Sequence, residues 1–524
     1  MMNKILLFIL LWLPFFVSGQ EVVMVVSDPH VLASSLVEEG EAFDSMMAGQ
    51  RKMLDVSEKT FVALVDTALR YKPSLVLIPG DMTKDGEVAS HEVVVNQLNR
   101  LCAAGIKVLV VPGNHDINGA AFAYRGGDKV SVESLQENAW ERTYSMVYDE
   151  VRAKDPNSLS YVSEPLSGVT VLGIDCADGV LSDESLSWLL VQADEARQKG
   201  NMIIAMSHWQ LLEHVDGGDL LIESSRMQDA DKVRDALMAH GVRMVLTGHV
   251  HINSISTYRD TTSVVGDSIV EISTGSPITY PCSYRWLTVS QDRSCVSVET
   301  DYLRYLIGEE DWVEYSRSWM KAHLANMIPG LSLRLFDKSV GVIEGIVADK
   351  LAGNPMASMI VMMVKQSLPQ TDEDKVALVE KHLGSTLVEL YLLHSLGNEP
   401  DRSETDSLAQ AMYHGMEMMI REMTEATLKS YKELQDYLVL ALQDANKSLI
   451  QSLVEDRTHW GTKYSNRTDD LQGSFVIQAP QTTSVVDLMM NNEWNGAIYD
   501  IQGRRVSEMQ QGVYIQNGKK LLIK

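Results

Sequence analysis

The chain has 524 residues, of which 45% are hydrophobic and 22% are charged. This length exceeds what one hydrophobic core supports, so we expect a folded protein of two or three domains. Acidic residues outnumber basic ones by 71 to 45, and the formal charge of −26 argues against nucleic-acid duplexes and anionic membranes as partners. A small anionic substrate is still compatible, because a metal site creates its own positive field.

The first 19 residues have the pattern of a signal peptide. Lys4 precedes an apolar run at residues 5–17, and the small residues Ser18 and Gly19 follow it. The run is short for a membrane span and has no stop-transfer flank, so we expect no stable membrane span. An uncleaved anchor is the alternative. The pattern predicts an exported protein that resides in the periplasm, at the cell surface or in the extracellular medium.

From residue 21 to about residue 300, short β runs alternate with amphipathic helices. Strands are predicted at residues 22–26, 75–78, 107–111, 169–174, 202–206 and 242–246. Helices are predicted at residues 58–70 with Ser57 as N-cap, 91–104, 183–198 with Ser182 as N-cap, and 231–240. Further apolar runs up to residue 299 predict antiparallel strands with a hairpin turn at 291–293. The alternation predicts an α/β fold with helices on the faces of a sheet.

Helical periodicity dominates from about residue 301 to residue 457, as in 375–396 and 407–453. The region is rich in methionine at helical spacing, which predicts core packing rather than a metal site. It follows the first region without a flexible linker, so we expect a scaffold or a lid, with a dimerisation surface as the alternative. After a linker at 480–484, short β runs between glycine turns predict a small C-terminal β segment.

Four cysteines, at positions 102, 176, 282 and 295, are far apart and form no CxxC motif. A metal–thiolate cluster is therefore not expected. In an exported chain they can form disulfides in three ways, and buried free thiols are the alternative.

Polar side chains follow five of the predicted strands, at the point where each strand ends. They are Asp28, His30, Asp81, Asn114, His115, Asp116, His208, His249 and His251. Ligands of α/β sheets bind beyond the carboxyl ends of the strands, so we expect these residues to gather at one edge. Their nitrogen and oxygen atoms suit Mn, Fe, Zn, Ni or Co. Nearby glycines, such as Gly113 and Gly248, permit tight turns and the close approach of a substrate.

The ordered motifs D-x-H, G-D, G-N-H-D, H and G-H-x-H resemble those of the calcineurin-like metallophosphoesterase family over roughly residues 21–301. The resemblance implies a metallophosphoesterase β-sandwich flanked by helices, in four αββα layers. It implies two divalent metal ions. One would be held by Asp28, His30, Asp81 and His251, and the other by Asp81, Asn114, His208 and His249. His115 would face the substrate, and Asp116 would orient His115.

Residues 80–86 look most like the branch of the family that contains bacterial cyclic-nucleotide and glycerol phosphodiesterases. The purple acid phosphatase branch is a poorer match, because it has a tyrosine where this chain has Lys84 and lacks a histidine at the position of His30. We therefore predict a colourless enzyme.

The resemblance implies a dinuclear-metal-dependent hydrolase of small phosphate esters, with phosphodiesterase activity by in-line attack of metal hydroxide. Asn114 would stabilise charge on the phosphoryl oxygens, and His115 would donate a proton to the leaving group. A phosphomonoesterase or nucleotidase on the same site is one alternative. A non-catalytic surface binding protein on a retained fold is an alternative from another class.

The expected organisation is a signal peptide at 1–19, a catalytic domain at 20–301, a mainly helical domain at 302–479 and a β segment at 480–524. Residues 498–524 resemble the C-terminal sorting domains of the bacterial type IX secretion route, which implies contact with secretion machinery. A small β appendage that only packs on the body is the alternative.

Overall fold

The computed structural model describes residues 21–149, 151–214, 225–260, 268–306, 311–324, 328–350, 362, 368–397, 402–428, 432–447, 450, 464–466 and 470–477, and four short C-terminal strands between 498 and 523. The predicted signal peptide and the predicted linker at 480–484 lie outside these residues. Among the helices described, none is long and apolar enough to cross a membrane. The four cysteines are free, and Cys176 and Cys282 are buried.

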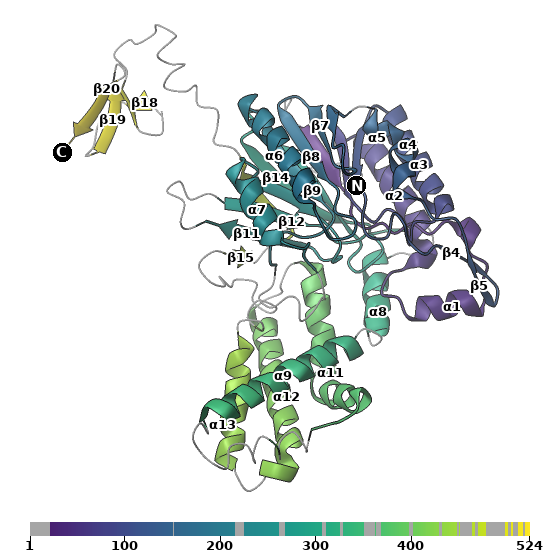
Figure 1. The fold of residues 1–524 in the computed structure, drawn as a ribbon, viewed down its shortest axis with the longest axis vertical. Helices are drawn as coiled ribbons and strands as arrows, with labels where there is room; N and C mark the ends of the chain where they lie inside the picture. Colours follow the sequence, from purple (N-terminus) through teal and green to yellow (C-terminus); the bar gives the residue numbers. More distant parts are fainter. Residues whose placement is uncertain are drawn as a thin grey trace, which may run out of the picture.

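Two mixed β-sheets make up the body of the molecule (Figure 1). The first has the order β16-β14-β13-β1-β2-β3 and consists of β1 (Glu21–Val25), β2 (Leu75–Pro79), β3 (Lys107–Val111), β13 (Ser283–Val289), β14 (Cys295–Tyr302) and β16 (Gln472–Val476). The second has the order β15-β11-β12-β10-β9-β8-β7-β6 and consists of β6 (Ala153–Lys154), β7 (Tyr161–Leu166), β8 (Val169–Ile174), β9 (Met202–Ser207), β10 (Met244–Thr247), β11 (Ser254–Arg259), β12 (Ser268–Ser273) and β15 (Tyr464–Asn466).

Strand direction determines where the loops of each sheet meet. Strands β1, β2 and β3 run parallel, and so do β8, β9, β10 and β12. The carboxyl ends of the strands in each parallel set therefore lie at one edge of their sheet.

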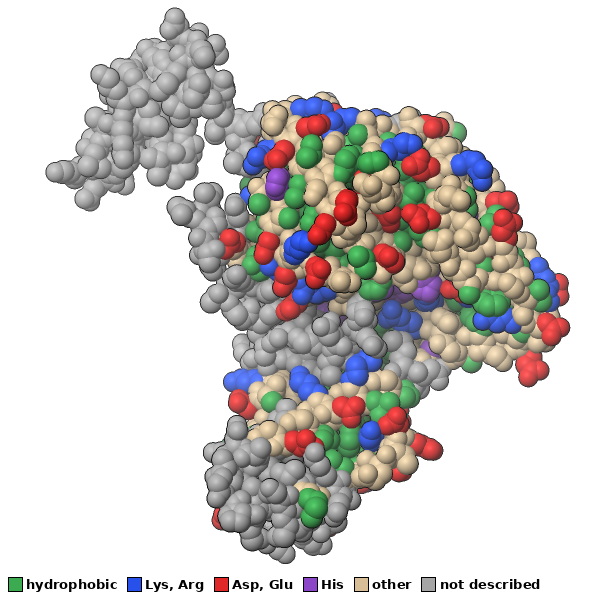
Figure 2. Space-filling model, viewed as in Figure 1, with side chains coloured by type: hydrophobic (Ala, Val, Ile, Leu, Met, Phe, Trp, Pro, Cys, Tyr) green, Lys and Arg blue, Asp and Glu red, His purple; other side chains and the backbone are tan. Residues whose placement is uncertain are grey.

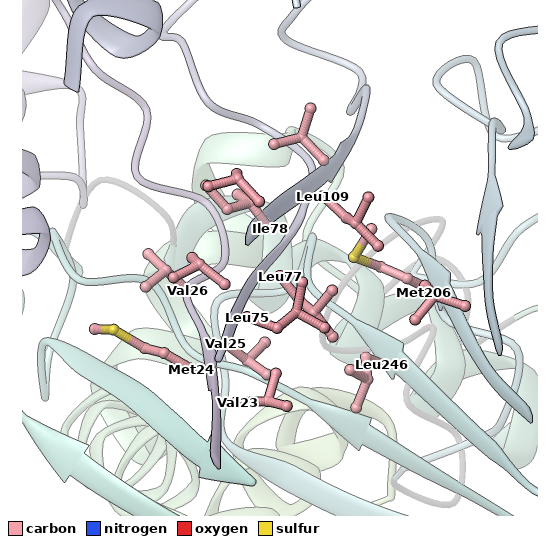
Figure 3. Close-up of a cluster of buried hydrophobic side chains, with 14 of the residues drawn as sticks. Val23, Met24, Val25, Val26, Leu75, Leu77, Ile78, Leu109, Met206 and Leu246 are labelled. Atoms are coloured by element: carbon pink, nitrogen blue, oxygen red, sulfur yellow. The ribbon is translucent and has the colours of Figure 1, made fainter. Parts of the chain in front are cut away.

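A shared hydrophobic core joins the two sheets. Val23 and Val25 of β1 and Leu77 of β2 belong to the same buried cluster as Met206 of β9 and Leu246 of β10 (Figure 3). Every residue of β2 is buried, as expected for a parallel strand covered on both faces.

Helices cover the outer faces of both sheets. Helices α2 (Ser57–Tyr71) and α3 (Val88–Ala103) contribute apolar residues to the cluster of the first sheet. Helices α6 (Asp183–Gln198) and α7 (Ala230–Ala239) pack on the second sheet through a separate cluster. The resulting αββα layers confirm the predicted fold class.

The two predicted helix caps have different outcomes. The Ser182 hydroxyl accepts a hydrogen bond from the Ser185 N–H at 3.1 Å, which confirms it as the cap of α6. The cap predicted at Ser57 is wrong, because its hydroxyl accepts from the Leu32 N–H at 2.9 Å and donates to the Leu54 carbonyl at 2.8 Å. Ser57 instead ties the loop after β1 to the start of α2.

Loops of the body carry short elements that periodicity did not predict. They are η1 (Ser34–Leu36), α1 (Glu41–Ala48), η2 (Leu54–Val56), β4 (Phe122–Arg125), β5 (Asp128–Ser131), α4 (Glu137–Thr143) and α5 (Ser145–Tyr148). The β4–β5 hairpin packs on α1, where the rings of Phe43 and Tyr124 lie 5.6 Å apart.

The helical region lies below the body in Figure 1. Its described helices include α8 (Trp312–Leu324), α9 (Ile328–Lys350), α11 (Asp372–Leu396), α12 (Arg402–Leu428) and α13 (Lys432–Ala445). The pattern predicted as one helical stretch at 407–453 contains two helices, α12 and α13. Met412, Met416, Met419 and Met423 are buried in the core of this region, as the packing prediction requires, whereas Met362 and Met418 are exposed.

After the helices the chain returns to both sheets. Strand β15 pairs with β11 and strand β16 pairs with β14, so each forms a new sheet edge. The prediction of a mainly helical domain at 302–479 missed these strands, and the body therefore includes residues between 464 and 477. The C-terminal strands β17 (Ile498–Asp500), β18 (Arg505–Val506), β19 (Gly512–Gln516) and β20 (Lys519–Ile523) form a separate sheet, as predicted.

Candidate metal centre

The predicted metal ligands meet beyond the carboxyl ends of β1, β2, β3, β9 and β10. Residues 221 positions apart are in direct contact there, because the His249 N–H lies 3.1 Å from each carboxylate oxygen of Asp28. The structure therefore brings together the residues that the strand-end argument predicted.

One part of the site is a buried cluster of Asp28, His30, Asp81 and His251, whose ligand atoms all lie within 4.8 Å of one another. The Nε2 atom of His30 lies 3.0 Å from Nε2 of His251 and 3.4 Å from Oδ2 of Asp81. The Nε2 atom of His251 lies 3.3 Å from Oδ1 of Asp28. Atoms that share an ion at ~2.1 Å are about 3 to 3.5 Å apart, so these spacings fit one metal ion.

The second part consists of Asn114, His208 and His249. The Nε2 atom of His208 lies 3.0 Å from Oδ1 of Asn114 and 3.3 Å from Nδ1 of His249. The same Asn114 oxygen lies 3.1 Å from Nδ1 of His249. These three atoms converge as ligands of one ion do.

A single carboxylate oxygen lies between the two clusters. Oδ2 of Asp81 is 3.4 Å from Nε2 of His30 and 3.3 Å from Nε2 of His208. The other oxygen, Oδ1, accepts a hydrogen bond from the His115 N–H at 2.9 Å. This placement suits a bridging ligand, and the donor set fits two divalent ions of the Mn, Fe, Zn, Ni or Co type.

Burial keeps three of the histidines in the neutral form that binds metal. Burial lowers the pKa of His251 to about 4 and, together with the charge of His208, lowers that of His249 to about 3. The pKa of His30 is also far below its usual range, because of burial and the nearby ammonium of Lys52. Nδ1 of His251 is buried and accepts or donates no hydrogen bond within the described part of the chain.

His208 behaves differently from its neighbours. Burial would lower its pKa, but the carboxylates of Asp81 and Asp28 outweigh burial and raise the pKa to about 9. Its Nδ1 lies 2.9 Å from the Pro79 carbonyl, which leaves Nε2 directed at the second cluster. His208 would therefore have to give up a proton in order to serve as a metal ligand.

The backbone of the site is strained where the ligands lie. Among the described residues, ten that are not glycine have positive φ, and five of them are predicted ligands, namely Asp28, His30, Asp81, His249 and His251. Such conformations are costly for these residue types and are concentrated at functional sites.

Two glycines make room for ligand side chains. A Cβ atom at Gly248 would lie 2.3 Å from Oδ2 of Asp28, and a Cβ atom at Gly113 would lie 2.2 Å from Oδ1 of Asp81. These glycines were predicted to allow the close approach of a substrate. In the structure they instead allow the close approach of the ligand side chains.

His115 stands at the open side of the site, with its side chain 31% exposed. Its Nδ1 lies 2.6 Å from the Lys84 carbonyl and 3.0 Å from Oδ1 of Asp85. The expectation that Asp116 orients this ring is corrected, because Asp85 contacts the imidazole.

Asp116 instead braces the loop that carries Asn114 and His115. Its carboxylate accepts hydrogen bonds from the N–H groups of Thr83 and Gly113, both at 2.9 Å, and from the Thr83 hydroxyl at 3.0 Å. Burial and the charge of Asp81 raise its pKa to about 7.

Other contacts were not predicted from the sequence. The indole of Trp209 stacks on the ring of His249 at 3.8 Å and holds that ring in place. Trp209 directly follows the ligand His208, which is a usable signal. Lys52 approaches His30 from a loop with no motif, and no sequence signal identifies it.

Comparison with known proteins agrees with this geometry. Residues 22–253 match the sequence profile of the calcineurin-like phosphoesterase family. This segment is a calcineurin-like phosphoesterase domain.

Two relatives align with part of the chain. The chain is 23% identical over 237 residues to a protein of Rhodococcus erythropolis named probable cyclic nucleotide phosphodiesterase, with 44% of this chain covered. It is 25% identical over 199 residues to a protein of the same name from Moraxella catarrhalis, with 37% of this chain covered. The matches span 66% and 64% of the relatives' own lengths.

Among solved structures, the chain is similar over part of its length to a dimetal phosphatase from Danio rerio. The identity is 14%, the TM-score is 0.38, and the match covers 53% of this chain and 95% of that one.

Proposed function

We propose that the chain is a dinuclear-metal-dependent hydrolase of small phosphate esters, with phosphodiesters as preferred substrates. The observation that carries this proposal is the position of Asp81 Oδ2, within 3.4 Å of the nearest histidine of each ligand cluster. The names of the two relatives support the preference for diesters.

One metal ion would be held by Asp28, His30, Asp81 and His251, and the other by Asp81, Asn114, His208 and His249. When bound, the pair supplies positive charge for the phosphoryl oxygens and lowers the pKa of water at the site.

The protein's own groups orient and protonate the substrate. Asp85 and the Lys84 carbonyl hold Nδ1 of His115, so a protonated imidazole keeps Nε2–H for the leaving oxygen. The Asn114 side chain is exposed and turns its amide oxygen to the histidines, which leaves its amide N–H groups to donate to a phosphoryl oxygen.

The first experiment measures hydrolysis of bis(4-nitrophenyl) phosphate and of 4-nitrophenyl phosphate by the full chain with Mn²⁺, and then with a chelator. We expect turnover of the diester that the chelator abolishes. Turnover of the monoester alone would favour the phosphomonoesterase or nucleotidase alternative. A protein that binds no divalent metal and hydrolyses neither ester would be the non-catalytic binding protein.

We also propose that the protein is exported and that its C-terminal strands act as a secretion signal of the type IX kind. The pattern of residues 1–19 and the separate sheet at 498–523 support this. Fractionation of cells that express the full chain or a chain lacking residues 480–524 tests it. We expect the shorter chain to stay in the periplasm, and equal secretion of both would contradict the C-terminal signal.

A further inference from the structure

The loop between α1 and η2 brings two cations to the metal centre. Nζ of Lys52 lies 3.5 Å from Nδ1 of His30, whose Nε2 belongs to the first ligand cluster. Arg51 donates a hydrogen bond from Nη1 to the hydroxyl of Tyr391, in α11 of the helical region. Both cations are half-buried. Figure 2 shows basic and histidine side chains gathered where the body meets the helical region.

Neither cation forms an ion pair with another described residue, although the charges of Asp81 and Asp85 act on Lys52 from farther away. Within the described residues, no carboxylate lies within 4.0 Å of Arg51 or Lys52, whereas the nearby Lys84 forms an ion pair with Asp85. The two carboxylates of the site, Asp28 and Asp81, do not balance the charge of two divalent ions. Additional cations next to such a centre raise its free energy unless an anion joins them.

The electrostatic effect of this loop reaches the ligands. Burial lowers the pKa of Lys52 to about 8, and the adjacent charge of Arg51 adds to this effect while Asp81 opposes it. The charges of Arg51 and Lys52 also contribute to the low pKa of His251. Lys52 therefore contacts a residue of the first ligand cluster, and Arg51 lies next to Lys52 in the loop.

We infer that Arg51 and Lys52 bind a second anionic group of the substrate, beside the phosphate that lies on the metal ions. The inference rests on the proposed phosphoesterase function and narrows its substrate class. A subsite of this kind selects phosphate esters that carry another phosphate or a carboxylate close to the ester that is cleaved.

Helix α11 holds this subsite in place. Its Tyr391 anchors Arg51, and its Glu389 pairs with Arg317 and Lys321 of α8. Gly397 caps the same helix, and a Cβ atom there would lie 2.7 Å from Cβ of Asn253, two residues after the ligand His251. The helical region thus contributes to substrate selection, beyond the scaffold or lid role expected from the sequence.

The test compares the binding of two phosphonates to the Mn²⁺-loaded full chain by calorimetry. Methylphosphonate carries one anionic group, and phosphonoacetate adds a carboxylate to the same framework, while neither has an ester to cleave. We expect phosphonoacetate to bind wild type at least about 10-fold more tightly, since charge-assisted hydrogen bonds are worth that much or more. In the Arg51→Gln/Lys52→Gln variant we expect this preference to fall to about 2-fold or less.

Matched variants distinguish loss of the anion subsite from a general loss of folding or metal binding. Lys59→Gln removes an exposed lysine near the start of α2 and should keep the wild-type preference, as should the charge-conserving Lys52→Arg. Tyr391→Phe, which frees Arg51, should reduce the preference about 2- to 5-fold. Equal binding of both phosphonates to wild type, or an unchanged preference in the double variant, would overturn the inference. Hydrolysis of bis(4-nitrophenyl) phosphate, measured in parallel, reports separately on the proposed function.

Discussion

At the scale of single residues, His115 connects the metal centre to the loop that follows β2. Asp85 and the Lys84 carbonyl fix its ring, and the ring lies 4.8 Å from that of His30 without taking part in either ligand cluster. We therefore separate its role from metal binding.

Replacing His115 by alanine should leave both metals bound and lower turnover by roughly 10²- to 10⁴-fold on alkyl esters, which need a proton on the leaving oxygen. The loss should be much smaller on nitrophenyl esters, whose leaving group departs unprotonated. Metal content and kcat for the two ester types are the measurements. An equal loss on both would refute the acid role.

Gly248→Ala should impair metal binding itself. The added Cβ would lie 2.0 Å from Oγ of Ser27 and 2.3 Å from Oδ2 of Asp28, so the carboxylate must move. We expect the bound metal to fall below two ions per chain and activity to fall with it. The control is Gly127→Ala, where nothing lies within 4 Å of the added atom. Full metal occupancy in Gly248→Ala would show that the site relaxes without cost.

The ligands were predictable from the sequence because their motifs directly follow strands. The contacts among the surrounding side chains were not. Asp85, not the sequence neighbour Asp116, contacts the imidazole of His115, and Lys52 reaches His30 from a loop whose sequence carries no spacing rule.

At the scale of elements, α3 is tied to the metal-binding loop by a buried histidine. In His91, Nε2 lies 2.8 Å from the Asp116 carbonyl and Nδ1 lies 2.7 Å from the Tyr144 hydroxyl. Burial lowers the pKa of His91 from 6.5 to about 4.

This shift predicts a loss of stability in acid. Between pH 6.5 and pH 4 the unfolded chain binds a proton at position 91 that the folded chain does not, so the free energy of unfolding falls as the pH falls. The full effect is on the order of 3 kcal/mol. Urea unfolding of His91→Gln at pH 7 and pH 5 should show a smaller pH-dependent loss than wild type. The control is His414→Gln, which replaces an exposed histidine of α12. It should retain the wild-type loss, and identical losses in all three proteins would contradict the prediction.

Elements that are continuous apolar runs were predicted well. Strands β3 and β8 match their predicted bounds residue for residue. Strand β7 was missed because Glu164 and Pro165 interrupt it, and β16 was missed because an edge strand exposes alternate residues. In the sequence alone, neither pattern can be distinguished from that of a loop, because the partner strand is not known.

At the scale of the whole molecule, the helical region is inserted within the body instead of following it. Strands β15 and β16 come after the helices and complete both sheets, and Arg285 of β13 donates to the Asp470 carbonyl at 2.7 Å. Strand β14 ends at Tyr302, close to the predicted change of texture at residue 301. The return of the chain to the body at residue 464 was missed, because pairing between such distant strands leaves no local signal.

Two truncations should therefore behave differently. A chain that ends at residue 302 exposes β11 and β14 as open edges and should elute as soluble aggregates in size-exclusion chromatography. A chain that ends at residue 479 keeps both sheets, so its elution and its thermal midpoint should stay within about 2 °C of the full chain. A monodisperse, stable chain ending at residue 302 would show that the returning strands are dispensable.

The late position of β15 and β16 also constrains synthesis. At about 5–20 residues per second, the roughly 160 residues between β14 and β15 take on the order of ten seconds or more to leave the ribosome. A chain that folded as it emerged would present two unpaired strand edges during that interval. A chain that stays unfolded until it has crossed a membrane already contains β15 and β16 when its sheets first form. The proposed export route would therefore prevent the two strand edges from being exposed during folding.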